Sequence, residues 1–114
     1  MPIIYHLADA AAWAAARMAG SYQGTADDRR DGFIHFSTAA QVRESASRHR
    51  RGVAGLLLVA VEADRLGAAL KWEPARGGQL FPHLHAPLDP ALAISAVPLP
   101  LAADGLHVFP DDLP

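Results

Sequence analysis

The sequence predicts an α+β fold with two helices and a small sheet that is split or strongly bent. Three observations support this class: short apolar runs of strand length outnumber the helical stretches, no internal repeat is present, and 114 residues suffice to bury one continuous hydrophobic core. We therefore expect residues 1–114 to form a single domain, with an irregular tail from about residue 101.

The first third of the chain predicts a strand followed by a helix. Ile3–His6 is a short apolar run, and the alanine-rich stretch Ala10–Ala19 predicts a helix that ends at Gly20. Trp13 and Met18 are the large apolar side chains of this helix, and we expect both to pack on the sheet.

The middle of the chain predicts a polar loop, a strand and a second helix. Residues 21–32 mix aspartates with arginines and are expected to form a solvated loop. Phe33–Phe36 predicts a strand. Thr38 and Gln41 fit a capping box, so the second helix is expected to start there and to run to about Arg51.

The remaining segments predict further strands. Val53–Val61 is a continuous apolar run, typical of a central strand buried on both faces. An extended piece at 70–73 and a glycine loop at 76–79 predict a hairpin. Prolines at both ends of 82–87 predict an edge strand or an extended loop, and Ile94–Leu99 gives a last strand.

The composition indicates which class of ligand and which cellular compartment to expect. The chain is 51% hydrophobic and has a formal net charge of -2, so it lacks the positive field that would attract nucleic acid. The basic residues 48–51 suit the negative end of the second predicted helix. The absence of cysteine excludes disulfides and thiolate chemistry. No signal peptide or membrane-spanning run is recognisable, so we expect a cytoplasmic monomer or homodimer that binds a small molecule.

Histidines mark the candidate functional site. His6, His35 and His83 each lie where an apolar, strand-like run meets a turn signal, and buried imidazoles are costly unless their nitrogens find partners. Because side chains two apart in a strand share a face, His35 and Ser37 are expected to project into the same pocket. Ser37 or Thr38 could instead cap a helix. A serine nucleophile would also need a base within reach, for which this spacing is a loose match.

A metal site is a second reading of the same histidines. His83 and His85 lie two apart, and His6 or His35 together with Glu73 could complete an open site for a divalent ion. Hydrogen bonds from these imidazoles to backbone carbonyls are the simpler alternative, and we name no metal ligands.

The segment Lys71-Trp72-Glu73-Pro74 places a carboxylate beside a large aromatic ring at the end of a strand. Glu73 could act as a general base or stabilise a developing cation, and the Trp72 indole could stack on a flat ring. Alternatively, Lys71 and Glu73 form an ordinary ion pair while Trp72 points into the core.

Taken together, these segments resemble the uncharacterised bacterial family known as domain of unknown function 952, and the match covers nearly the whole chain to about Pro100. The resemblance implies an ADP-ribosyltransferase-like fold, in which two antiparallel halves of a small split sheet, with mixed pairing possible, meet around a nicotinamide-sized cleft. The segments that carry it are Tyr5-His6, residues 31–38, residues 71–74 and residues 80–85.

This resemblance also implies roles for individual residues. His6 would grip the nicotinamide ribose, Ser37 or Thr38 would support the ring pocket, and Glu73 would bind a ribose hydroxyl and stabilise an oxocarbenium-like transition state. Lys71 replaces the acceptor-selecting Glu or Gln of the protein-modifying toxins, which argues against protein modification. The leading hypothesis is therefore an enzyme or enzyme-like domain that binds NAD or a related nucleotide through His6, His35, Ser37, Thr38, Glu73, His83 and His85. A non-catalytic small-ligand module and a His/Glu metal site with hydrolytic activity remain the alternatives.

Overall fold

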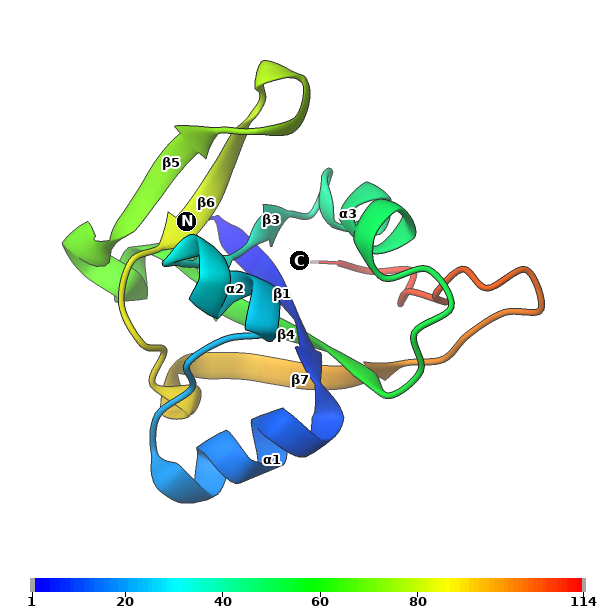
Figure 1. Cartoon of the computed structure of the whole chain (residues 1–114), viewed down its shortest axis with the longest axis horizontal. Helices are drawn as coiled ribbons and strands as arrows, with labels where there is room; N and C mark the ends of the chain where they lie inside the picture. Colours follow the sequence, from blue (N-terminus) through cyan, green and yellow to red (C-terminus); the bar gives the residue numbers. More distant parts are fainter. Residues whose placement is uncertain (1, 114) are drawn as a thin grey trace.

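The computed structural model describes residues 2–113, which form two separate antiparallel sheets and three α-helices. The larger sheet has the strand order β3-β1-β4-β7 and the smaller one the order β2-β6-β5. The predicted α+β class with a split sheet is thus confirmed. Figure 1 shows the β5–β6 hairpin projecting away from the larger sheet, with α1 on the opposite side of the molecule. The 3-10 helices span Ala63–Ala69, Arg76–Gly78 and Pro90–Leu92.

The larger sheet is built around β4 (Leu56–Glu62), which pairs with β1 (Ile3–Asp9) on one side and β7 (Ala93–Leu99) on the other. Its side chains alternate between two clusters of buried residues, so both faces of the strand are covered. Val59 packs in one cluster and Leu58 in the other, and each is at most 2% exposed. The predicted central strand is confirmed.

Helix α1 (Ala10–Ala19) packs on this sheet and ends at Gly20, as predicted. Trp13 is only 3% exposed and belongs to the core. Met18 is 91% exposed, so the prediction that it packs on the sheet is wrong. The reason is helical geometry: five residues separate the two side chains, which turns Met18 well away from the face that buries Trp13 and Ala16.

Helix α2 (Ala26–Asp31) occupies the segment expected to be a solvated loop, and that prediction is wrong. Thr25 caps the helix: its hydroxyl accepts from the Asp28 amide, and the Asp28 carboxylate accepts from the Thr25 amide. Gly32, in the left-handed region at φ 87°, ends the helix. The single turn is too short to show an apolar periodicity, so only the capping residues signal it.

The second predicted helix, α3 (Val42–His49), begins later than expected. Thr38 does not cap it, because residues Ser37–Thr38 form strand β3 against β1. Gln41 accepts a hydrogen bond from the Thr38 amide through Oε1, so only this half of the predicted capping box exists. By pairing with β1, Ser37 and Thr38 place their backbone polar groups in a sheet, where these groups find hydrogen-bond partners.

The smaller sheet contains the predicted hairpin, β5 (Leu70–Pro74) and β6 (Leu80–Leu84). β6 is its central strand, because β2 (Ile34–His35) pairs with the other edge, so the prediction of an edge strand or loop is wrong. Pro82 is tolerated because β2 ends opposite His83, and only the Pro82 carbonyl is used, by the Phe36 amide.

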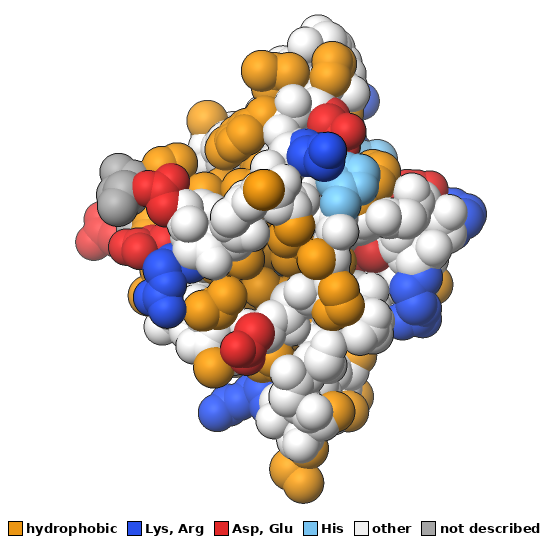
Figure 2. All heavy atoms as spheres, turned by 90° about the vertical axis from the view of Figure 1, so that its left-hand side faces the viewer, with side chains coloured by type: hydrophobic (Ala, Val, Ile, Leu, Met, Phe, Trp, Pro, Cys, Tyr) orange, Lys and Arg blue, Asp and Glu red, His pale blue; other side chains and the backbone are white. Residues whose placement is uncertain are grey.

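Beyond β7, residues 100–113 contain no helix or strand, and an isolated bridge joins Leu101 to His107. Phe109 and Leu113 fold back onto the cluster around Tyr5. Within residues 2–113, no helix is long and apolar enough to cross a membrane. A few large apolar side chains reach the surface, including Trp72 and Ile94, and hydrophobic side chains are scattered among polar ones on the face drawn in Figure 2.

Candidate functional site

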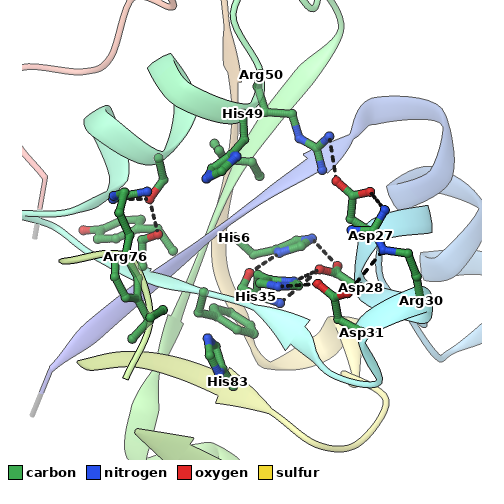
Figure 3. A pocket seen from close by; sticks show the side chains of 17 residues that line it. His6, Asp27, Asp28, Arg30, Asp31, His35, His49, Arg50, Arg76 and His83 are labelled. Atoms are coloured by element: carbon green, nitrogen blue, oxygen red, sulfur yellow. Dashed lines mark hydrogen bonds and ion pairs between the residues drawn. The ribbon is translucent and has the colours of Figure 1, made fainter. Parts of the chain in front are cut away.

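A cavity of about 360 Å³ is lined mainly by polar and charged residues. Its walls come from β1, β2, β3, β6, the helices α2 and α3, and the connection that follows β5 (Figure 3). The size suits a small organic ligand or part of a nucleotide. The charged and histidine side chains that line it are His6, Asp27, Asp28, Arg30, Asp31, His35, His49, Arg50, Arg76 and His83.

The structure divides the predicted site residues into two groups. Lining the cavity are His6, His35, Ser37 and His83. Outside its lining are Thr38, Trp72, Glu73 and His85. Trp72 is 40% exposed, so the alternative that placed its indole in the core is wrong.

His6 is a buried, neutral imidazole with both nitrogens occupied. Its Nδ1 lies 2.7 Å from the His35 carbonyl, which can only accept, so Nδ1 carries the proton. Nε2 then accepts from the Tyr22 hydroxyl at 2.7 Å. Burial lowers the pKa of His6, which keeps the ring uncharged. His6 therefore fixes the backbone of β2 and leaves no ring nitrogen for a ligand in this arrangement.

His35 lies between two carboxylates of α2. Its Nδ1 is 2.5 Å from Asp28 Oδ1, and its Nε2 is 3.1 Å from Asp31 Oδ2. Because carboxylates accept, the ring makes both bonds only when both nitrogens carry protons. The side chain is 41% exposed, so it forms a visible part of the cavity wall. It ties β2 to α2 at this wall (Figure 3).

Asp28 is the polar centre of that wall, at 3% exposure. Its carboxylate accepts from the amides of Thr25 and His35 and from the His35 ring. Burial alone would raise the pKa of Asp28, but these bonds and the nearby His6 bring it below its usual range. Asp28 is thus ionised at neutral pH and holds α2, β2 and the His35 ring together.

His83 lines the cavity and uses only one of its two ring nitrogens in hydrogen bonds within residues 2–113. Its Nδ1 donates to Glu73 Oε1 at 2.8 Å, and the ring stacks on Phe33 with centroids 4.0 Å apart. Among residues 2–113, Nε2 of His83 has no hydrogen-bond partner. Burial lowers the pKa of His83, although the Glu73 bond opposes the change. The result is a neutral imidazole, oriented by a carboxylate, with a lone pair available.

Glu73 supports this histidine from outside the cavity. Its Oε1 also accepts from His85 Nε2 at 2.8 Å. The hydrogen bonds from His85 and His83 lower the pKa of Glu73, so the carboxylate is ionised at neutral pH. Glu73, which the sequence predicted as a site residue, therefore lies behind the cavity wall and contacts His83 from there. Its ion-pair partners within residues 2–113 are His83 and His85, and Lys71 is not among them.

Two hydroxyls and a guanidinium form another part of the cavity wall. Ser37 and Ser45 share a hydrogen bond of 2.9 Å between their Oγ atoms. Arg76 reaches Ser45 Oγ at 3.5 Å, pairs with Glu44 at 3.0 Å and lies over the Phe81 ring. These contacts hold the guanidinium in a fixed orientation.

Sequence reasoning missed Asp28, Asp31, Ser45, Arg50 and Arg76 as site residues. For Asp28 a signal existed, since Thr25 and Asp28 have the spacing of a helix cap. The others carry no local signal, because their place in the cavity depends on how α3 and the hairpin pack. In the part of the chain that the structure describes, no group of three or more His, Asp or Glu side chains is arranged to hold a metal ion.

Sequence comparison gives the family. The profile of a protein family of unknown function, DUF952, matches residues 7–97. The chain belongs to this family. A crystal structure of protein CC0527 from Caulobacter crescentus is 45% identical to this chain, covers 93% of both chains and superposes with a TM-score of 0.90. The solution NMR structure of CC0527 is 46% identical, covers 93% of this chain and 91% of its own, with a TM-score of 0.82.

No curated protein matches the sequence. The family match confirms the predicted family, and the structure confirms an architecture of antiparallel sheets and helices. The ADP-ribosyltransferase-like fold and the activity that the resemblance implies stay predictions.

Proposed function

We propose that this DUF952 protein binds NAD or a closely related nucleotide in the cavity and cleaves its glycosidic bond to nicotinamide. The observation that carries the proposal is His83: a neutral imidazole on the cavity wall, with Nδ1 bound to an ionised carboxylate and Nε2 without a partner in residues 2–113. An imidazole held in this way is suited to accept a proton. The two antiparallel sheets around the cavity support an ADP-ribosyltransferase-like architecture for this chemistry.

The reaction needs one proton acceptor and no acid. The nicotinamide nitrogen of NAD is positively charged, so the bond from it to ribose C1′ breaks with the electron pair moving to that nitrogen, and nicotinamide leaves neutral. A water oxygen forms the new bond to C1′, and its proton passes to His83 Nε2. The Glu73 carboxylate stabilises the imidazolium that results, as it already accepts from Nδ1.

The proposal gives two residues other roles than the resemblance implied. His6 and Glu73 act here as positioning residues, His6 for the backbone of His35 and Glu73 for the ring of His83. Ser37 keeps its proposed place beside the ligand because it lines the cavity. Thr38 has no assigned contact with the ligand.

A non-catalytic nucleotide-binding module is the second candidate. It is favoured by the saturated hydrogen bonding of His6 and His35, whose ring nitrogens all have partners already. A binding module needs a cavity of suitable shape and charge but no proton acceptor. The effect of replacing His83 on nicotinamide release therefore distinguishes the enzyme from the binding module.

The test combines calorimetric titration with NAD and chromatographic detection of nicotinamide. In the proposed enzyme, His83→Gln should retain NAD affinity within a few-fold while release of nicotinamide falls about a hundredfold or more, the range of general-base contributions. His85→Gln is the matched control: it removes the other imidazole bound to Glu73, lies outside the cavity lining, and should leave release nearly unchanged. NAD binding without release from the native protein would favour the binding module. Absence of NAD binding would reject both.

A further inference from the structure

The charges of the cavity are divided between two walls. Arg76 and Arg50 come from the hairpin connection and from the end of α3. Helix α2 contributes three carboxylates, Asp27, Asp28 and Asp31, and one cation, Arg30, which pairs with Asp27 and Asp31. Figure 3 shows Arg76 and His49 on the side of the cavity away from Asp28 and Asp31, with Arg50 at its upper end. A ligand with charge at both ends would therefore bind in one direction only.

We propose that Ser45, Arg50 and Arg76 form a subsite for the phosphates of the nucleotide, and that the positively charged nicotinamide end lies against the α2 carboxylates. The nature of the full ligand rests on the proposed function above. The phosphate subsite itself rests on the residues of this wall alone.

Arg76 has the features of a prearranged anion-binding group. Its side chain is 22% exposed, and its guanidinium is held by Glu44 at 3.0 Å and by the Phe81 ring, 5.0 Å from the centroid. The Ser45 hydroxyl, 3.5 Å from the guanidinium, can turn its proton towards an added oxygen. A planar guanidinium beside a hydroxyl matches the geometry of a phosphate group.

Arg50 supplies a charge that is only weakly paired. Its side chain is 25% exposed, and the nearest carboxylate oxygen of residues 2–113, on Asp27, is 4.0 Å from the guanidinium. No hydrogen bond from this guanidinium is formed within the same residues. The adjacent His49 ring also lines the cavity, and its pKa is lowered by burial and by Arg76 and Arg50. A bound phosphate could approach Arg50 more closely than Asp27 does and so pair with it more strongly.

Carboxylates outnumber cations on the α2 wall, where Asp27, Asp28 and Asp31 stand against Arg30. Asp31 Oδ2 and the Asp28 carboxylate lie on either side of the His35 ring. Asp31 is 36% exposed and can approach a ligand, while Asp28 is buried and acts at longer range. A cationic nicotinamide ring is favoured beside these groups over the uncharged ring of NADH.

The experiment is calorimetric titration with four probes: NAD, NADH, ADP-ribose and inorganic pyrophosphate. Arg50→Gln and Arg76→Gln should each weaken ADP-ribose and pyrophosphate binding about tenfold or more, the effect of losing one hydrogen bond to a charged group. Arg51→Gln is the control, since Arg51 is exposed, bonds the Asp104 carbonyl and does not line the cavity. It should change affinity less than twofold. Thermal unfolding of each variant verifies that it is folded.

The outcomes separate the two proposals. If NAD binds and both cavity arginine variants bind ADP-ribose as the native protein does, the phosphate subsite is wrong and the proposed function stands. If NAD fails to bind but pyrophosphate binds in a way that needs Arg50 and Arg76, the subsite stands and the proposed function fails. Asp31→Asn should remove the preference for NAD over NADH, and an unchanged preference would reject the direction of binding. Binding of no probe would overturn both proposals.

Discussion

Replacing Asp28 by alanine should destabilise the protein more than any other single loss of charge in α2. The carboxylate is 3% exposed and accepts three hydrogen bonds, from the amides of Thr25 and His35 and from the His35 ring. Alanine leaves all three donors without their acceptor, two of them on the backbone, and removes the group that joins α2 to β2.

The size of the effect follows from these contacts. A hydrogen bond to a charged group contributes about 1.5–3 kcal/mol, so three of them amount to roughly 4.5–9 kcal/mol. Relief from burying the carboxylate offsets several kcal/mol of this. A net loss of about 3–5 kcal/mol remains, which is the range found when one member of a buried pair is removed. Domains of this size have only about 5–15 kcal/mol in total, so Asp28→Ala should be close to unfolding.

Urea unfolding at neutral pH, followed by the fluorescence of the buried Trp13, measures this loss. The matched control is Asp27→Ala. Asp27 is the preceding residue of α2, 49% exposed and paired on the surface with Arg30 at 3.0 Å, so its removal should cost less than about 1 kcal/mol. If the two variants unfold within about 1 kcal/mol of each other, Asp28 is not the anchor described above.

Two further predictions concern pH and backbone space. His6, His49 and His83 all have a pKa below the ordinary 6.5, so the unfolded chain takes up protons first, and the free energy of unfolding should fall as pH drops below about 6.5. Urea midpoints between pH 8 and pH 5 measure this decline. Gly24→Ala should destabilise by about 1–3 kcal/mol, because the new Cβ would lie 2.6 Å from the Asp28 carboxylate oxygen and from its Cβ.

Each has a control. His6→Gln should flatten the dependence on pH while lowering stability overall, and an unchanged slope would show that His6 is not the main group involved. Gly32→Ala meets no atom within 4 Å, so it tests backbone strain alone and should cost less than Gly24→Ala. Equal losses in the two glycine variants would contradict the close contact with Asp28.

Elements with a local signal could be predicted from the sequence. The alanine-rich helix and the apolar runs of β1, β4 and β7 are found where composition and length predicted them, because burial on one or both faces leaves a pattern in the chain. Helix α2 could not be recognised from periodicity, and β6 could not be recognised as a central strand. Its pairing with β2 depends on residues 34–35, which are distant in sequence and form a strand of only two residues.

The site was predictable in part for the same reason. His6, His35, Ser37 and His83 all lie in strands, and the cavity forms where these strands come together. The position of Glu73 behind His83, rather than in the cavity, depends on the register between β5 and β6, which local composition does not encode. The arginines of the opposite wall likewise depend on the packing of α3.

The measurement that tests the central claim most directly is an NMR titration of the imidazole nitrogens with NAD. Binding in the cavity should shift Nε2 of His83 strongly, because His83 lines the cavity and this nitrogen has no partner in residues 2–113. His107, which bonds the Val53 carbonyl and does not line the cavity, should stay unchanged and serves as the internal control. Unshifted His83 signals at saturating NAD, or equal shifts at His83 and His107, would contradict the proposal that this cavity is the nucleotide site.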